Sequence, residues 1–340
     1  MRQCTDAVEW QSFLQDRDRT LFHRWEWNAA FESYGLNLER FAAYDRGRIV
    51  GILPLVRQKG RIFGEQFVSL PWFDYTGVLA DSSTIAAALI DRVAARVHSE
   101  PDAVLQIRQL HPLYSLTVEP VCRLDKMLMR LPLPKSPKEL WQALKPKVRN
   151  QIRKAEKSGI GVIIGGPELV DEFYNVYAHN MRDLGSPSHS LRFFEAICRA
   201  FPAEVKIAVA RLSDKTVGAG FTLSNGTALE IPWGSSLPEY NALCINHAMY
   251  WQLLANAAEA GYDAFHFGRS TVDSGTYSFK KQWGAVSVQL FWYHSSGNAS
   301  RAVWMARPVQ AKFGFAQQIW SRLPVPLTKI LGPLLIARIP

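Results

Sequence analysis

The chain has 340 residues, of which 48% are hydrophobic and 20% are charged, and this composition excludes an intrinsically disordered protein. Its net charge of +9 is concentrated at one end, because eight lysines and arginines and no carboxylate side chain follow Asp273. A segment with charge of one sign favours an anionic partner, such as a membrane surface, a nucleic acid or a phosphorylated substrate.

Several protein classes are excluded by missing patterns. No apolar run of about 18 residues and no signal-peptide core is present, so we expect a cytoplasmic protein without a spanning helix. The four cysteines form no CxxC pair, and no histidine has metal-ligand spacing, so we expect reduced thiols and no metal. The motifs GxxxxGK[ST], GxGxxG, HExxH and GxSxG are absent. The sequence contains no motif that reads the grooves of DNA, so genomic DNA is not expected as a partner.

The first predicted element is a hairpin over residues 41–57, with its turn at Asp45-Arg46-Gly47-Arg48. A third strand is expected near residues 67–79. A helix is predicted over 84–98, where apolar residues recur every four positions, and a further strand near 103–110.

The same order of elements returns about 160 residues later. A hairpin is predicted over 207–223, a third strand over 227–234 after the turn Asn225-Gly226, a helix over 244–262 and a strand over 264–270. This order is that of the GNAT acyltransferase fold. We therefore predict an α/β (α+β) protein of two tandem GNAT-like domains, each a mixed sheet flanked by helices. A chance coincidence of hairpins is the alternative.

Between the two repeats, residues 136–159 have the pattern of an amphipathic helix. Ser136 and Glu139 form a capping box, and Pro146 is expected to kink the helix or to start a new one. Cations recur at four-residue spacing beside an apolar stripe, at Lys145, Arg149, Arg153 and Lys157. Like charges at this spacing repel, so the basic stripe favours an anionic ligand. A solvated face whose long side chains cover the core is the alternative.

Beyond residue 300, large apolar side chains alternate with isolated cations. We expect Pro308, Pro324, Pro326 and Pro333 to break this tail into short pieces. Short apolar and basic segments suit the plane of an anionic bilayer, which would place the protein at the inner face of the membrane. Packing of the tail on the protein's own core is the alternative.

These patterns predict four parts. They are a first GNAT-like domain (1–135), a basic connecting helix (136–160), a second GNAT-like domain with the active site (161–300) and a basic, apolar C-terminal tail (301–340).

Four stretches carry a resemblance to a known family: SLPWFDYTGVLAD (69–81), KVRNQIRKAEKSG (147–159), LEIPWGSS (229–236) and FHFGRSTVDSGTYSFKKQWG (265–284). They resemble the Fem family of aminoacyltransferases, and most closely the FemAB-like proteins of bacterial exosortase/PEP-CTERM systems. The resemblance does not extend to the tail. It implies a tandem GNAT fold and metal-free transfer of an aminoacyl group from aminoacyl-tRNA to an amine of a cell-envelope precursor.

In Fem enzymes, a Phe-Lys pair near the end of the second domain lies at the reacting ester, and this sequence has Phe279-Lys280 there. An ammonium group can stabilise the oxyanion of ester attack, and an aromatic ring can stack on the terminal adenine of tRNA. Lys281 would contact a phosphate. Ordinary lysines in a loop at the end of a strand are the alternative.

The remaining candidates are less specific. Arg149, Arg153 and Arg269 would hold phosphates of tRNA or of a polyprenyl-diphosphate substrate. Glu230 is a candidate general base, with a strand-face ion pair as its alternative, and Asp273 is a second candidate base. Tyr277 and Trp233 complete the predicted substrate-binding set. His266 stands where relatives more often show Asp and is given no role.

The acyl donor and acceptor are left open. The usual coenzyme A signature is missing from DYTGVLADSST and from GSSLPEYNALCIN, which favours aminoacyl-tRNA over an acyl-coenzyme A as the donor. The segment HRWEWNAAFESYG lacks the lysine with which some Fem enzymes hold a nucleotide-linked precursor, so an exopolysaccharide component or another amine is also expected as acceptor. No tightly bound cofactor is expected. The rival functions are an acyl-coenzyme A-dependent N-acyltransferase and a non-catalytic scaffold of a polysaccharide-export system.

Overall fold

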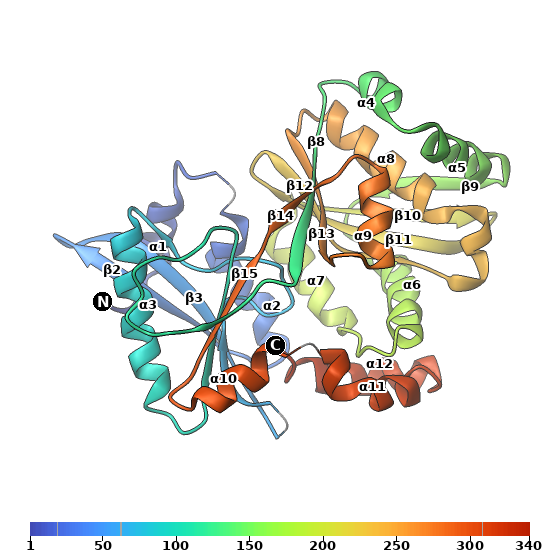
Figure 1. Cartoon of the computed structure of the whole chain (residues 1–340). Helices are drawn as coiled ribbons and strands as arrows, with labels where there is room; N and C mark the ends of the chain where they lie inside the picture. The colour runs from blue at the N-terminus through green and yellow to red at the C-terminus, as the bar shows by residue number, and fades with distance from the viewer. Residues whose placement is uncertain (19, 62, 308) are drawn as a thin grey trace. The chain divides into compact units, whose positions relative to one another are not determined.

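The computed structural model describes residues 1–340 except Arg19, Ile62 and Pro308. The chain forms two compact units, and Figure 1 labels most of their longer helices and strands. Unit 1 consists of Met1–Met127, Gln289–Gly314 and Leu334–Pro340, and unit 2 consists of Leu128–Val288 and Phe315–Pro333.

Unit 1 is built on a mixed sheet. In spatial order its strands are β1 (Arg2–Gln3), β2 (Leu38–Asp45), β3 (Arg48–Gly60), β4 (Gly64–Val68), β6 (Val104–Gln109), β15 (Phe291–Ser295) and β7 (Val121–Arg123), and β5 (Leu79–Ala80) pairs with β3. The pairs β2–β3 and β3–β4 are antiparallel, whereas β4 and β6 are parallel. Such a parallel pair needs a crossover connection, which here contains α3 (Ser83–His98). The other helices are α1 (Ala7–Leu14), η1 (Leu21–His23), η2 (Trp25–Trp27), α2 (Asn28–Glu32) and α10 (Ala299–Ala306).

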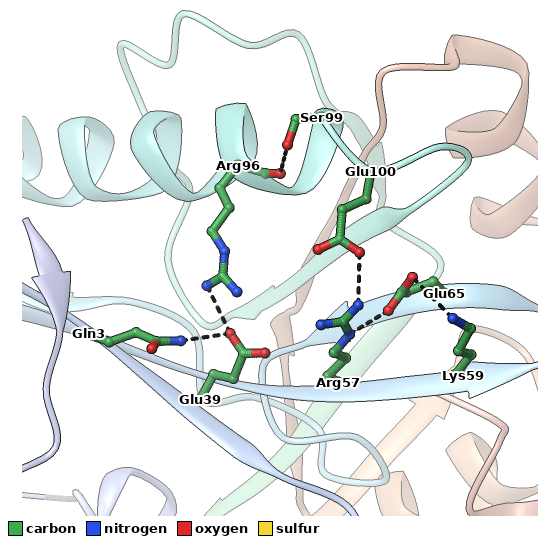
Figure 2. Close-up of polar contacts among 8 residues, drawn as sticks. All are labelled: Gln3, Glu39, Arg57, Lys59, Glu65, Arg96, Ser99 and Glu100. Atoms are coloured by element: carbon green, nitrogen blue, oxygen red, sulfur yellow. Dashed lines mark hydrogen bonds and ion pairs between the residues drawn. The ribbon is translucent and has the colours of Figure 1, made fainter.

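Helix α3 covers the sheet of unit 1 and is fixed by both apolar and charged contacts. Ser82 caps its N-terminus by accepting from the backbone N–H of Ile85, and Leu89 and Val93 belong to the core beneath it. Figure 2 shows the charged contacts of this region, where Arg96 Nη1 lies 2.9 Å from Glu39 Oε2. Arg57 on β3 contacts both Glu65 and Glu100. The cations of this region are therefore balanced locally by carboxylates.

Unit 2 repeats this design. In spatial order its strands are β14 (Val286–Gln289), β8 (Lys126–Pro132), β13 (Ala264–Thr271), β12 (Ala228–Ser236), β11 (Lys215–Asn225), β10 (Val205–Leu212) and β9 (Ile160–Gly165). Strands β9 to β12 pair antiparallel, whereas β12 and β13 are parallel and are joined through α8 (Ile245–Glu259). The other helices of this part of the chain are α4 (Pro137–Ala143), α5 (Pro146–Lys157), η3 (Pro167–Leu169), α6 (Val170–Asp183), α7 (Leu191–Ala200), η4 (Pro238–Leu243), α9 (Gly275–Gln282), α11 (Val309–Trp320) and α12 (Val325–Ile336).

Most predicted elements are confirmed. Both hairpins, both crossover helices and both strands that come after them are present. Ser136 caps α4 by accepting from the backbone N–H of Glu139, and Pro146 starts the new helix α5.

Two expectations and one alternative interpretation are wrong. The third strand of the first repeat ends at Val68 instead of running over 67–79, because residues 69–78 form a buried loop that uses side-chain and backbone partners. The segment after Thr271 is the helix α9, capped by Ser274, and not a loop. Pro333 lies inside α12 without ending it, in a helix that is held against the protein at Thr328 and Gly332. Pro308 lies outside the described residues.

The unit boundaries differ from the expected divisions near residues 135 and 300. Most of β8, from Leu128, belongs to unit 2 and lies beside β13, whereas β15 belongs to unit 1 and lies between β6 and β7. Each sheet thus takes a strand from a stretch that the repeat pattern assigned elsewhere. The tail is divided as well, since Phe315–Pro333 belongs to unit 2 and Leu334–Pro340 to unit 1.

Candidate active site

The parallel pair β12–β13 separates after three residue pairs. Their register runs from Ala228–Ala264 to Glu230–His266, although both strands continue beyond it. At the same place β12 has a bulge opposite β11, where the register shifts between Phe221 and Leu223. Pro232 lies in this bulge, where its missing N–H costs no ladder bond. Bulges are common next to active sites because they redirect side chains.

Glu230 and His266 form a buried pair at the last paired position. Glu230 Oε1 accepts from Asn225 Nδ2 at 2.8 Å and lies 3.4 Å from His266 Nδ1. The two side chains are 8% and 3% exposed. A carboxylate beside an imidazole can accept and pass on a proton, so this pair meets the requirement for general-base chemistry. Glu230 is thus paired, as its alternative interpretation predicted, although its partner is a residue to which the sequence assigned no role.

The pair lies on the face of the sheet opposite α8. Phe265 and Phe267 pack against Tyr250 of α8, with ring centroids 6.4 and 5.3 Å away. Because neighbouring side chains of a strand point to opposite faces, His266 points away from α8. The predicted pair Phe279-Lys280 contacts groups other than Glu230 and His266.

Helix α9 comes directly after β13 and positions Phe279 and Lys280. Ser274 begins it by accepting from the backbone N–H of Tyr277 at 3.2 Å. Lys280 is 8% exposed, and its Nζ donates to the carbonyl oxygens of Gly268 and Arg269 at 3.1 and 2.8 Å. The ammonium group therefore binds the end of β13, in the stretch that is no longer paired with β12.

Phe279 belongs to an aromatic cluster with α8. Its ring centroid lies 5.3 Å from His247, 5.4 Å from Tyr250 and 6.2 Å from Trp283. Burial, with a contribution from the charge of Lys147, lowers the pKa of His247 to about 4. Burial likewise raises the pKa of Tyr250 to about 12. Both groups are therefore neutral at pH 7, so the rings that surround Phe279 carry no charge.

The basic helix α5 presents its arginines beside an indole. Arg149 Nη1 donates to the carbonyl oxygens of Trp141 and Gln142 at the end of α4, at 3.4 and 3.3 Å. Arg153 is exposed and lies 5.4 Å from the centroid of the Trp141 ring. Trp141 in turn packs edge-on against Trp251 of α8 at 4.8 Å. These contacts hold Arg149 and Arg153 to α4 and α5, and they do not bring either arginine to Lys280.

The other predicted residues lie in different surroundings. Trp233 is 9% exposed and packs on Phe194 and Phe221, at 5.1 and 5.6 Å, as part of the core. Arg269, Asp273 and Lys281 are exposed, and Tyr277 is half-buried with its hydroxyl 3.4 Å from Ser287 Oγ. Asp273 has φ +61°, so it forms the turn between β13 and α9.

The corresponding place in unit 1 is filled by main chain. Strands β4 and β6 also pair over three positions, and the last pair is Val68–Gln106. Beyond it, the backbone N–H groups of Ser69 and Thr76 donate to β6 carbonyls, and the buried Arg108 Nη1 donates to Phe73 O at 2.7 Å. Gly77 is needed for this packing, since a Cβ there would lie 1.6 Å from Gln109 Oε1. Unit 1 thus has no carboxylate at the position of Glu230, and a loop occupies its β6 edge.

Metal sites and membrane spans are both absent from the part of the chain that the structure describes. These residues hold no group of three or more His, Cys, Asp and Glu side chains placed to bind a metal ion. None of their helices is long and apolar enough to cross a membrane.

Comparison with known proteins identifies the class of the fold. Residues 143–281, which lie within unit 2, match the family described as Acetyltransferase (GNAT) domain. The chain is a tandem GNAT-fold protein, with two mixed sheets flanked by helices.

Solved structures with the same fold make the similarity more particular. The crystal structure of FemX is similar with a TM-score of 0.63 and 15% identity, over 86% of this chain and 97% of that one. The C-terminal domain of a putative lysylphosphatidylglycerol synthetase from Agrobacterium fabrum is similar with a TM-score of 0.59 and 13% identity, over 88% of this chain and 94% of that one. The structure of L-PGS from Bacillus licheniformis is similar with a TM-score of 0.58 and 14% identity, over 94% of this chain and 98% of that one. No curated protein sequence matches significantly. The FemX match confirms the fold implied by the Fem resemblance, and the exosortase association stays a prediction.

His266 is the residue that sequence reasoning missed. The signal was available in principle, because parallel pairing of the strands at 227–234 and 264–270 brings residue 230 opposite one of the residues near 266. The register that selects His266 is fixed only by the folded sheet. His247 is a second such residue, since nothing in the sequence indicates that the start of α8 packs against α9.

Proposed function

We propose that the protein is a Fem-like acyltransferase that forms an amide bond, transferring an aminoacyl or acyl group to an amine of a cell-envelope or exopolysaccharide precursor. The observation that carries this proposal is the parting of β12 from β13 directly after the buried Glu230–His266 pair, with the Lys280 ammonium bound to the end of β13. The GNAT family match of the same residues supports it.

The reaction requires a base that accepts a proton and a positive charge near the reacting ester. The acceptor amine attacks the carbonyl carbon of the donor ester, a C–N bond forms, the C–O bond breaks, and the amine loses a proton. In the proposed mechanism, Glu230, oriented by Asn225 and His266, accepts that proton. The leaving oxygen departs as an alcohol when it is protonated.

Lys280 has a positioning role in this proposal. Two of its protons are directed at the carbonyls of Gly268 and Arg269, so it fixes the shape of the β13 end and contributes positive charge there. Phe279 supplies an apolar surface beside it. This differs from a freely exposed lysine that would approach the ester by itself.

The aminoacyl donor is favoured by the fold neighbours. One of them is described as a domain of a putative lysylphosphatidylglycerol synthetase, and the lysyl group in that name is an aminoacyl group. We propose aminoacyl-tRNA as the donor, with Arg149, Arg153, Arg269 and Lys281 near its phosphates, Asp273 in the turn before α9 and Tyr277 at the start of α9. No tightly bound cofactor takes part.

A second candidate is an acyl-coenzyme A-dependent N-acyltransferase. The description of the matching family as an acetyltransferase domain favours it. A thermal-shift experiment separates the two donors, because a ligand that binds only the folded state raises the melting temperature. If acetyl-coenzyme A raises the melting temperature and a 3′-aminoacyl-adenosine does not, the donor is an acyl-coenzyme A and not an aminoacyl-tRNA.

Activity is tested with the full-length protein, an envelope fraction as acceptor, and either aminoacyl-tRNA charged with labelled amino acids or labelled acetyl-coenzyme A. Amide-linked product is measured as label that survives the mild alkali that hydrolyses esters. We expect Lys280→Ala to lower the rate about a hundredfold or more and Lys280→Arg to restore part of it. Lys206→Ala, on the exposed face of β10, serves as the control and should retain full activity.

A negative result in both the activity and the thermal-shift experiments would reject the enzymatic proposal. If no donor yields alkali-stable label, and if neither donor analogue shifts the melting temperature, the buried Lys280 has a structural role and the scaffold function is supported. If Lys280→Ala is as active as the parent protein, the site lies elsewhere in the GNAT domain.

A further inference from the structure

The outward faces of α11 and α12 are apolar (Figure 1 shows both helices). On α11, Phe315 and Ile319 are 77% and 50% exposed and lie four residues apart. On α12, Leu327, Ile330 and Leu334 are 40%, 67% and 57% exposed and recur at spacings of three and four. Residues at these spacings share one face of a helix, so each helix presents an apolar stripe outward.

The inward contacts of α12 and of the segment before it are polar or close, whereas α11 buries Trp320 at its end. Thr328 is 1% exposed, and Lys329 Nζ donates to Asn175 Oδ1 of α6 at 2.8 Å. Gly332 lies against Ser188, where a Cβ would be 2.8 Å from the Ser188 carbonyl oxygen. Arg182 Nη1 donates to Leu323 O between the two helices at 3.2 Å. A helix that only covers a core has the opposite polarity to α12, with its apolar face inward.

Packing within the chain therefore does not account for the two stripes. Single exposed apolar residues are common, but several on adjoining faces mark an interaction site. At 12 residues α12 is about 18 Å long, too short to cross a bilayer, which leaves an orientation parallel to the surface.

The charge around the stripes identifies the kind of surface. No Asp or Glu lies in α11, in α12 or anywhere after Asp273, and Arg322 and Arg338 are exposed near the ends of α12. Other exposed apolar side chains have different neighbours, as at Val8, which lies between Asp6 and Glu9. Apolar side chains accompanied, within the two helices and their flanking residues, by cations and no carboxylate fit a bilayer that carries anionic lipids, where the cations remain at the headgroups.

We propose that α11 and α12 form a docking surface for an anionic bilayer, with Phe315, Ile319, Leu327 and Ile330, all of unit 2, inserted at the boundary between headgroups and acyl chains. This surface is separate from the acyl-transfer site and does not depend on the proposed reaction. The proposal combines the two interpretations of the tail. One face of the helices packs on the protein, and the other face contacts the membrane.

The test is co-flotation of the full-length protein with phosphatidylcholine vesicles that contain or lack phosphatidylglycerol. We expect binding to the anionic vesicles that weakens as salt is added. The double variant Phe315→Ser/Ile330→Ser should lower the partition coefficient by about tenfold or more, since it removes two exposed apolar side chains. Arg322→Gln should lower it by about fivefold on anionic vesicles.

Matched controls lie on other exposed positions. The double variant Val8→Ser/Ile163→Ser removes side chains that are 78% and 45% exposed on α1 and β9, and should bind as the parent does. Arg48→Gln, in the β2–β3 hairpin, is the control for charge. Circular dichroism establishes that each variant is folded.

Three results would overturn the proposal. The first is no binding of the folded protein to either vesicle. The second is an equal loss of binding in the control variants. The third is a dimer in light scattering that Phe315→Ser/Ile330→Ser converts to a monomer, which would assign the stripes to a second copy of the chain.

Discussion

The two GNAT-like domains share one scaffold but differ at the place where the parallel strands separate. In each, a parallel pair holds for three positions after a crossover that contains a long helix. In unit 1 the last pair is Val68–Gln106, and the loop of residues 69–78 then occupies the β6 backbone. In unit 2 the last pair is Glu230–His266, and a lysine ammonium binds the free end of β13. The two sheets are therefore alike, and they differ in the groups at and beyond the last strand pair, which are backbone of a loop in unit 1 and a carboxylate, an imidazole and an ammonium group in unit 2.

The largest expected effect is on activity in unit 2. Glu230→Gln keeps an oxygen that can accept from Asn225 but removes the basic carboxylate, so we expect the acyl-transfer rate to fall about 10²- to 10⁴-fold. The melting temperature should change little. The rate is measured as alkali-stable label, with Glu259→Gln, at the exposed end of α8, as the unaffected control. Unchanged activity of Glu230→Gln would mean that Glu230 is not the general base, so the carboxylate that unit 1 lacks would not explain a difference in chemistry between the two domains.

The next effect is on the stability of unit 1. Arg108→Met keeps an aliphatic chain near the Trp292 ring but deletes the donors to Phe73 O and Gln106 Oε1. We expect the free energy of unfolding to fall by about 3 kcal/mol, because buried acceptors lose charged donors. Urea denaturation measures it, with Arg48→Met at an exposed position as control. A stable Arg108→Met protein would mean that the loop of residues 69–78 is held in place by other contacts.

Acid should weaken both domains through buried histidines. Burial lowers the pKa of His189 in unit 2 and of His294 in unit 1 to about 3 each, below the usual 6.5. Between these values the unfolded chain binds more protons, so stability falls as pH falls below about 6.5. Each histidine should cost about 1 to 2 kcal/mol between pH 6.5 and pH 5.

His189→Phe separates the two contributions. The ring of His189 stacks on Phe193 at 4.4 Å, and a phenyl ring can keep that stacking. The urea midpoint of this variant should depend less on pH than that of the parent, while the contribution of His294 remains. An unaltered pH dependence would show that His189 is accessible to protons in the folded state.

The smallest effect concerns the loop that fills unit 1. Trp72 Nε1 donates to the carbonyl oxygens of Ile336 and Ile339 at 3.3 and 2.9 Å, and its ring stacks on Phe31. Trp72→Phe keeps the stacking and loses the hydrogen bonds, so we expect a loss of about 1 kcal/mol. Limited proteolysis should then cleave residues 334–340 faster, whereas Tyr114→Phe at an exposed site should not change the rate. Equal cleavage of both variants would mean that Gln58, which also donates to Ala337 O and Ile339 O, holds the segment alone.

The sequence by itself determined the repeated scaffold, the cap at Ser136, the new helix at Pro146 and the concentration of cations after Asp273. These features are local: strand alternation, turn residues, helix periodicity and capping act over a few neighbouring positions. It also pointed to the segment around Lys280, through the resemblance that it carries.

Only the tertiary structure decided the register that puts His266 beside Glu230, the filling of unit 1 by residues 69–78, the placement of β8 and β15, and the outward direction of the apolar stripes on α11 and α12. Each of these depends on which distant segments pair or pack. A strand's own pattern does not specify its partner or its register, and a helix with apolar residues on one side does not reveal whether that side faces a core or a bilayer.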